Sequence, residues 1–252
     1  MSFTAAAETI LRRELFGTQV HALGMEGALA WIRARIAART PAYVVTLNGA
    51  LLVQAARDPE LRAVVNDAGL VTADGIAVIL AARILGVDLR ERVAGIDLAV
   101  ALCEVAAAAG YRLFLFGGRP GVADATADAL RRIHPSLQVV GTHDGFYDPD
   151  DEAAIGTRIR QVRPDILLVA LGAPRQERWM RRWHAELGVP VSIGVGGSFD
   201  VLAGRIPRAP RWMQQAGLEW LYRALREPRR WGVIRTIPPL FLLALRERLR
   251  RR

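Results

Sequence analysis

Polar, glycine-rich turns follow five apolar runs of this sequence. They read TLNG, TADG, GGRPG, GAPRQE and GVGGSFD, and they begin at residues 46, 72, 117, 172 and 194. Backbone amides in such turns approach an anion closely, and a helix N-terminus after the turn favours negative charge. A single turn of this kind also serves merely to end a strand. Five such turns together indicate a ligand cleft, and a nucleotide diphosphate is the ligand that would suit it.

Alternating apolar runs and helical patterns supply the elements that must position these turns. The runs predict strands at 43–47, 70–72, 112–116, 138–140, 166–171 and 191–195. The helical patterns between them lie at 28–39, 97–109, 122–134 and 176–187. This order predicts an α/β fold, Rossmann-like, with a mostly parallel sheet covered by helices on both faces. Ligands of such sheets bind beyond the carboxyl ends of the strands, where the five turns lie.

Charge divides the 252 residues unevenly. The net charge is +9, and all 34 basic residues are Arg. Residues 205–252 hold 13 Arg and three acidic residues, which leaves 21 Arg and 22 acidic residues for 1–204. Three of the six tryptophans also lie in 205–252. We therefore expect an α/β catalytic body at 1–204 and an Arg- and Trp-rich helical appendage at 205–252, whose charge suits anionic lipid or nucleic acid.

Several functions lack their sequence signatures. No GxGxxG follows the first run and no GxxxxGK[ST] occurs, which argues against dinucleotide and P-loop sites. The single cysteine, Cys103, forms no internal disulfide, and the four histidines stand far apart. Asp148, Asp150 and Asp151 resemble an acidic ion site, but they open a helical stretch, where acids cap backbone amides. The sequence therefore predicts neither a metal nor a cofactor.

The ends of the chain carry no targeting or spanning pattern. The first 15 residues lack a basic segment followed by an apolar core, as a signal peptide would have. The apolar run at 237–245 is far shorter than the roughly 18 to 20 residues that cross a bilayer. We expect a cytoplasmic protein.

Seven motifs in order resemble one known family. They are TLNGALLVQAARDPEL, ADGIAVILAARILG, ERVAGIDL, LFLFGG, GAPRQERWM, GVGGSFDVLAG and PRAPRWMQQAGLEWLYRALREPRR. Between residues 43 and 230 the chain resembles the WecG/TagA/CpsF glycosyltransferases, glycosyltransferase family 26. The resemblance implies an inverting transfer of N-acetylmannosamine, its uronic acid or glucose from a UDP-sugar to a polyprenyl-diphosphate-linked acceptor. It also implies work at the inner face of the bacterial membrane without an obvious metal site.

The resemblance also implies catalytic roles. Asp74, in the ADG motif, matches the proposed general base of the family, which takes the proton of the acceptor hydroxyl during direct displacement. A carboxylate that only caps the following helix is the alternative. Arg223 and Arg230 match arginines thought to swing over the site and neutralise the departing UDP.

Six further positions match substrate-binding residues of the family. Thr46 and Asn48 would bind the donor sugar or the diphosphate, and Arg92 would bind the diphosphate through its planar fork. Gln176 and Asp200 would meet the nucleoside, and Phe146, beside Tyr147, would place a ring next to the base. Asp97 fits the first turn of its helix, and we treat it as structural. Turn formation, surface charge and core packing are the alternatives for these residues.

The appendage is predicted to contact a membrane. Residues 209–225 place Trp212, Leu218 and Leu221 among arginines at helical spacing, which is typical of an interfacial helix on anionic lipid. Pro238 and Pro239 would separate this helix from an apolar patch at 240–252. Docking onto the body would give a similar stripe. We expect deletion of 205–252 to abolish transfer and to leave a folded body.

Other functions stay open at this point. A nucleic-acid-binding module would use the same basic tail and would bind with a steep dependence on salt, but the body has no basic patch and no recognisable nucleic-acid motif. We therefore expect no nucleic-acid partner. A soluble sugar-nucleotide hydrolase or epimerase is a third class. Within the family, a UDP-glucosyl or UDP-uronosyl transferase is the alternative to the N-acetylmannosaminyl enzyme. The sequence also allows a homo-oligomer.

Overall fold

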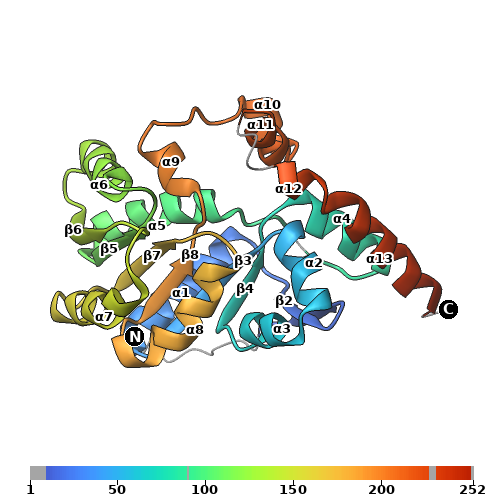
Figure 1. The fold of residues 1–252 in the computed structure, drawn as a ribbon, viewed down its shortest axis with the longest axis horizontal. Coiled ribbons are helices and arrows are strands. Elements are labelled where there is room, and N and C mark those ends of the chain that lie inside the picture. The colour runs from blue at the N-terminus through green and yellow to red at the C-terminus, as the bar shows by residue number, and fades with distance from the viewer. Residues whose placement is uncertain (1–9, 90, 227–230, 251–252) are drawn as a thin grey trace, which may run out of the picture.

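A six-stranded parallel sheet forms the centre of the protein, as a computed structural model describes it for residues 10–89, 91–226 and 231–250 (Figure 1). The strand order is β4-β3-β8-β7-β5-β6, and every neighbouring pair is parallel. The strands are β3 (Ala42–Leu47), β4 (Leu70–Ala73), β5 (Arg112–Gly117), β6 (Gln138–His143), β7 (Ile166–Ala170) and β8 (Val191–Gly194). The predicted α/β fold is confirmed.

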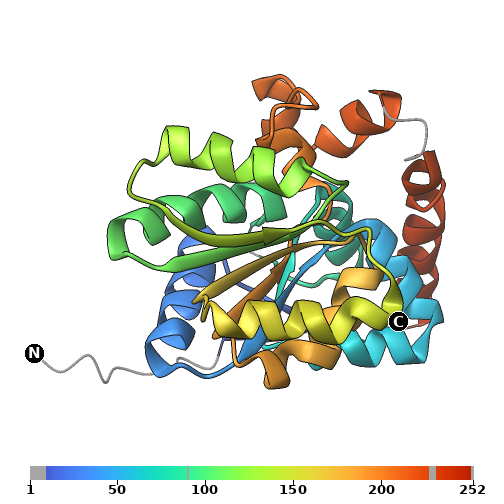
Figure 2. The ribbon, with the colours of Figure 1, turned by 60° about the vertical axis from the view of Figure 1, so that its left-hand side comes forward.

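The strands are largely apolar because helices cover both faces of the sheet, although the edge strand β6 has the sequence QVVGTH and is only partly buried (Figure 2). In β3, Tyr43, Val45 and Leu47 point into one core cluster, and Val44 points into the other. The first cluster lies under α2 (Gly49–Arg57), α3 (Pro59–Asn66), α4 (Ile76–Leu85), α7 (Glu152–Gln161) and α8 (Arg175–Leu187). The second lies under α1 (Met25–Ala38), α5 (Gly95–Ala109), α6 (Val122–Ile133) and α9 (Ser198–Leu202).

A small antiparallel hairpin precedes the sheet, and the sequence analysis did not predict it. It consists of β1 (Arg12–Leu15) and β2 (Thr18–His21). Nδ1 of His21 accepts a hydrogen bond of 2.9 Å from the backbone N–H of Val71 in β4. Burial lowers the pKa of His21 to about 4, so the ring stays neutral and keeps this acceptor at neutral pH.

The first part of the appendage at 205–252, called the tail from here on, forms two short helices, so the predicted single helix over 209–225 is wrong. They are α10 (Arg211–Gln215) and α11 (Glu219–Arg226). Gly217 separates them with a φ of +70°, a conformation that favours glycine. A Cβ at Gly217 would lie 2.7 Å from Cβ of Ile76, so only glycine lets the tail pass this closely over the start of α4.

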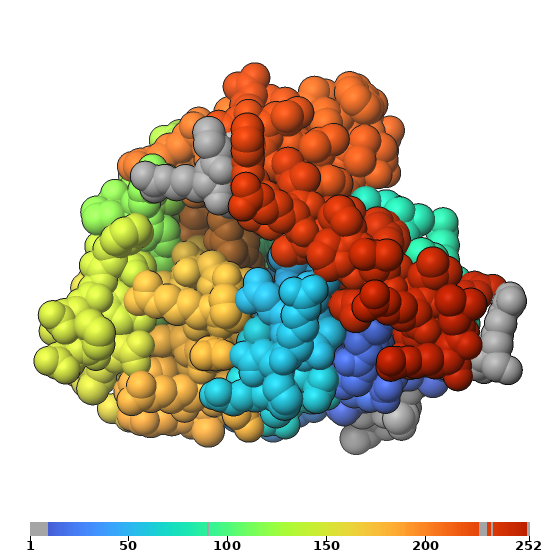
Figure 3. All heavy atoms as spheres, turned by 45° about the vertical axis from the view of Figure 1, so that its right-hand side comes forward, coloured from blue at the N-terminus to red at the C-terminus, as the bar shows by residue number. Residues whose placement is uncertain are grey.

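The last helices are α12 (Trp231–Ile234) and α13 (Ile237–Arg250), and α13 packs on the body. Pro238 and Pro239 lie in the first turn of α13, where proline is tolerated, so they do not separate two segments as expected. Leu240 and Ala244 are fully buried in the first core cluster, against α4 and α2. Figure 3 shows the tail, in orange and red, lying across the body above α2. The division at residue 204 therefore stays a prediction that rests on charge.

None of the helices within the described ranges is both long enough and apolar enough to cross a bilayer.

Candidate active site

The ends of β3 and β4 bring the predicted catalytic base next to two predicted substrate-binding residues. The two strands pair in parallel, with Leu47 opposite Ala73, so Asn48 and Asp74 leave the same edge of the sheet. The backbone N–H of Asp74 donates a hydrogen bond of 2.8 Å to the carbonyl of Leu47. Thr46 lies on β3, two residues before Asn48, and belongs to the same corner. Strand order, rather than distance along the chain, thus assembles this part of the site.

Gly95, in helix α5, packs against this corner. It is the first residue of α5, and its backbone N–H donates to the Asp74 carboxylate at the positive end of the helix dipole. A Cβ on Gly95 would lie 3.0 Å from Oγ1 of Thr46 and 3.3 Å from Oδ2 of Asp74. Oγ1 of Thr46 donates a hydrogen bond of 2.7 Å to the carbonyl of Gly194 in β8. The carboxylate therefore has a defined position with little free space behind it.

The pKa of Asp74 suits proton transfer near neutral pH. Burial raises the pKa of this carboxyl to about 7. The Gly95 amide and the Arg92 guanidinium lower it, because both favour the charged form. The carboxylates of Asp97 and Glu219 raise it by repulsion. A carboxylate tuned in this way can accept a proton from an alcohol that attacks beside it.

Replacing Gly95 by Ala tests how closely this corner is packed. The added methyl group would press on both Thr46 and Asp74, so we expect kcat/KM for sugar transfer to fall about tenfold, because small displacements of reacting groups are costly. Thermal stability should change little, since the backbone of Gly95 is ordinary helix. Gly232→Ala is the matched control, because a Cβ there meets nothing within 4 Å. Equal activity of the two variants would show that Asp74 tolerates the crowding.

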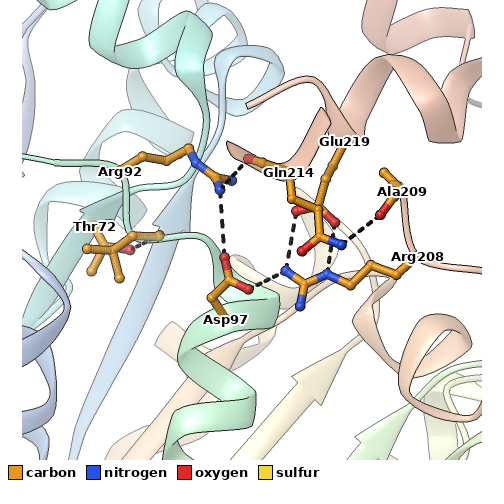
Figure 4. Close-up of polar contacts among 8 residues, drawn as sticks. Thr72, Arg92, Asp97, Arg208, Ala209, Gln214 and Glu219 are labelled. Atoms are coloured by element: carbon orange, nitrogen blue, oxygen red, sulfur yellow. Dashed lines mark hydrogen bonds and ion pairs between the residues drawn. The ribbon is translucent and has the colours of Figure 1, made fainter. Parts of the chain in front are cut away.

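An ion network links this corner to the tail (Figure 4). Nη2 of Arg92 lies 3.7 Å from Oδ2 of Asp97 and donates a hydrogen bond of 3.2 Å to the carbonyl of Gln214 at the end of α10. Oδ1 of Asp97 accepts from Nη2 of Arg208. Nε of Arg208 donates a hydrogen bond of 3.0 Å to Oε1 of Glu219. Arg92, whose charge lowers the pKa of Asp74, thus already has partners in the protein, and its predicted role at the diphosphate stays a prediction.

Sequence reasoning missed two members of this network. Arg208 and Glu219 were not singled out, whereas Asp97 lies in the first turn of α5, as predicted. Glu219 is one of only three acidic residues in 205–252, and this rarity was the available signal. A rare acidic residue in a basic segment indicates an ion pair with a specific cationic partner.

Of the two predicted catalytic arginines of the tail, the structure describes Arg223. Arg223 is half-buried on α11, four residues after Glu219. Arg230 lies outside the described residues. The role of both remains a proposal.

Asn48 caps a helix beside the Asp74 corner. Its side chain accepts a hydrogen bond of 3.0 Å from the backbone N–H of Leu51 and caps α2. This bond engages Oδ1 and orients the side-chain amide at the edge of the site.

Gln176 holds the glycine turn after β8. Its Oε1 accepts a hydrogen bond of 3.0 Å from the backbone N–H of Gly196, and its Nε2 donates one of 2.8 Å to Oε1 of Glu177. Glu177, which sequence reasoning missed, is fully buried, and burial raises its pKa to about 7. A Cβ on Gly194 would lie 2.8 Å from Nε2 of Gln176, so a side chain there would displace the Gln176 amide. Gln176 thus shapes the turn that precedes α9.

The predicted nucleoside residues spread along the same edge of the sheet. Asp200 is half-buried on α9, which follows β8, and Gln176 follows β7. These strands are two and three positions from β4, or about 10 and 14 Å at about 4.8 Å per strand. Phe146 is exposed and follows β6, but the neighbouring Gly145 lies against the ends of β5 and β7: its N–H donates a hydrogen bond of 2.8 Å to the carbonyl of Gly118, and its carbonyl accepts one of 3.1 Å from Nη1 of Arg175. Gln176, Asp200 and the loop that carries Phe146 therefore lie along the same carboxyl edge of the sheet as Asp74.

Tyr147, beside Phe146, forms part of a packed aromatic group. Its ring centroid lies 5.6 Å from that of Phe116, and the Arg175 guanidinium lies 4.8 Å from the ring centroid. Its hydroxyl donates a hydrogen bond of 3.1 Å to Oε1 of Glu152. Packing thus accounts for Tyr147, whereas Phe146 is 70% exposed.

The acidic run at 148–151 forms a cap. Oδ1 of Asp148 accepts a hydrogen bond of 3.2 Å from the backbone N–H of Asp150, at the start of a short 3-10 helix (Pro149–Asp151). The predicted capping role of Asp148 is confirmed. Within the described ranges, no three His, Cys, Asp or Glu side chains gather in a way that would hold a metal ion.

Comparison with known proteins identifies the family. The model of the glycosyl transferase WecG/TagA/CpsF family matches residues 13–252. The chain is 34% identical over 197 residues to the N-acetylglucosaminyldiphosphoundecaprenol N-acetyl-beta-D-mannosaminyltransferase of Bacillus spizizenii, covering 78% of this chain and 76% of that protein. It is 33% identical over 206 residues to the enzyme of the same name from Bacillus subtilis, covering 82% and 80%. The predicted resemblance is thereby confirmed, and the chain belongs to the glycosyl transferase WecG/TagA/CpsF family.

Proposed function

We propose that this enzyme transfers N-acetylmannosamine from its UDP derivative to N-acetylglucosaminyl-diphosphoundecaprenol, for the synthesis of a cell-surface polysaccharide. The donor and acceptor are proposed from the names of the two Bacillus relatives. The observation that carries the proposal is Asp74, a single carboxyl with a pKa of about 7 at the carboxyl edge of a parallel sheet, next to an arginine network.

The proposed reaction is a direct displacement with inversion. Asp74 takes the proton from the acceptor hydroxyl while that oxygen forms its bond to the anomeric carbon of the donor. The bond between the anomeric carbon and the diphosphate oxygen breaks, and UDP leaves with the electron pair. One base and stabilisation of the leaving anion are sufficient, so no second carboxylate is needed close to Asp74.

We propose that arginines receive the departing charge. Arg92 lies beside Asp74, and its fork suits a diphosphate. Arg223 and Arg230 are proposed to reach over the site from the tail. Their positive charge would favour the transition state over the bound donor, in which less charge has developed on the leaving oxygen.

The donor is proposed to lie along the strand ends. Thr46 and Asn48 would bind the sugar or the diphosphate, and the glycine turn after β8 would supply backbone amides to the phosphates. Gln176 and Asp200 would meet the nucleoside, with Phe146 near the base. Because Gln176 is bound to Gly196 and Glu177, its contribution would come largely through the shape of the turn.

One incubation tests the proposed function. The protein is mixed with synthetic lipid-diphosphate-GlcNAc and, in separate reactions, with UDP-N-acetylmannosamine, UDP-N-acetylglucosamine or UDP-glucose, and the product mass is read. We expect a disaccharide lipid from the first donor. Release of free sugar without acceptor would instead indicate a hydrolase, and a product from UDP-glucose alone would change the donor.

We further propose that the tail rests on an anionic membrane surface, at the cytoplasmic face. Leu242, Leu245 and Leu249 are exposed and share the outer face of α13, opposite the buried Leu240. Arg246 and other exposed arginines flank this stripe, and exposed Trp212 and Trp231 lie on α10 and α12. Apolar side chains rimmed by arginine and tryptophan are typical of an interfacial helix.

Replacing the three outer leucines of α13 by Ser tests this membrane surface. We expect binding to vesicles with anionic lipid to weaken at least about tenfold, because each leucine loses roughly 1.5–3 kcal/mol of apolar burial as an upper bound. Sedimentation with vesicles measures this. Ile133→Ser, at an exposed apolar position on α6, is the control and should bind like the unchanged protein. Equal binding of both variants to vesicles would contradict the proposed surface.

A further inference from the structure

Arg208 joins the tail to the body at a point outside any helix or strand. It lies in the linker between α9 and α10, and its guanidinium contacts one carboxylate from the body and one from the tail. Nε lies 3.0 Å from Oε1 of Glu219, and Nη2 lies 3.5 Å from Oε2, so the fork grips both oxygens. Nη2 also donates to Oδ1 of Asp97 at the start of α5. Paired geometry of this kind fixes orientation as well as distance.

The ion pair between Arg208 and Glu219 determines which face of α11 points toward the body. Glu219 is the first residue of α11, and Arg223 follows it by four residues. Side chains four residues apart lie on the same face of a helix. An ion pair that holds Glu219 against the body therefore also turns Arg223 toward the body.

A second contact keeps the tail from rotating about this pair. Arg92 donates to the carbonyl of Gln214 at the end of α10, and it shares the Asp97 carboxylate with Arg208. Two arginines and two carboxylates thus hold α10 and α11 at two points (Figure 4). The Glu219 side chain is only 14% exposed, so loss of its cationic partner would leave a poorly solvated charge that favours undocking of α11.

We propose that Arg208 is a positioning residue that directs Arg223 toward the departing diphosphate by clamping Glu219 against Asp97. This inference rests on the proposed transfer reaction and on the role proposed for Arg223. Direct binding of the diphosphate by Arg208 is the competing explanation. It is an outcome of the experiment below, because a guanidinium already shared by two carboxylates is poorly placed to hold substrate as well.

The experiment compares full-length Arg208→Gln, Glu219→Gln and the double variant with Arg205→Gln. Arg205 is an exposed arginine of the same linker, so its replacement removes the same charge. If Arg208 acts by positioning Arg223, the loss falls on the transition state, so kcat should drop about 10- to 100-fold and the KM for the UDP-sugar should change less than about threefold. The double variant should be no slower than Arg208→Gln, because the two residues act as one pair. Arg205→Gln should keep the kcat of the unchanged enzyme.

Amide hydrogen exchange provides a readout that needs no substrate. Arg208→Gln and Glu219→Gln should each speed exchange in peptides of α11, while β3 and α5 keep their protection. A rise in KM with unchanged kcat would assign Arg208 to direct donor binding and overturn the proposal. So would additive losses in the double variant, or unchanged exchange in α11. If no UDP-sugar is turned over, the proposed function fails, whereas faster exchange in α11 would still establish the clamp.

Discussion

Asp74→Asn is expected to lower kcat by about 10²- to 10⁴-fold, the usual contribution of a general base. The amide has the shape of the carboxylate and can still accept the hydrogen bond from the Gly95 N–H, so the fold should survive. It cannot take the proton of the acceptor hydroxyl. Product formation in the lipid-acceptor assay measures the loss, and UDP binding by calorimetry checks that the donor site is intact.

The pH dependence of the unchanged enzyme supplies the control for this variant. Burial raises the pKa of Asp74 to about 7, and a base acts only in its ionised form. The rate should therefore rise with pH through about 7 and level off above it, and at pH 6 it should be about one tenth of the plateau. The residual rate of Asp74→Asn should lack this step. An Asp74→Asn enzyme with nearly full activity would remove Asp74 from the mechanism.

Leu240→Ala is expected to cost about 2–5 kcal/mol of the free energy of unfolding, the range for a leucine truncated inside a core. Leu240 is 0% exposed and packs with α2 and α4, whose first turns follow Asn48 and Asp74. A Cβ on Gly49 would lie 3.2 Å from Cδ2 of Leu240, which shows how closely α13 covers the start of α2. Urea unfolding followed by circular dichroism measures the loss.

Leu245→Ala is the matched control, since Leu245 lies on the same helix but is 52% exposed. Its cost should stay within about 0.5 kcal/mol, as for most surface substitutions. Equal stability of the two variants would mean that α13 does not dock on the body in solution. A large difference would also revise the expectation that deletion of 205–252 leaves a folded body, because the deletion would expose the surface under Leu240.

Local patterns in the sequence were sufficient for the sheet and for part of the site. Apolar runs such as 112–116 predicted all six strands. The inner strands are apolar because helices cover both of their faces, whereas the edge strand β6 is only partly buried. Asp74 and Asn48 were singled out because a parallel sheet places whatever follows its strands at one edge, and the roles proposed for them came from the family resemblance. The hairpin at 12–21 escaped prediction, because its short strands carry mixed polar and apolar residues without a clear period.

Only the tertiary structure decided what surrounds Asp74 and where the tail lies. Asp97 and Arg208 are 111 residues apart in the sequence, and no local spacing pairs them. The apolar stripe of α13 suits a membrane or a core equally well, and packing against α2 and α4 assigned Leu240 to the core. The sequence by itself determined the types of residue at the strand ends, since backbone preference and apolar periodicity act locally. Ion pairing, burial and pKa depend on which distant segments meet, so they emerged only in the folded chain.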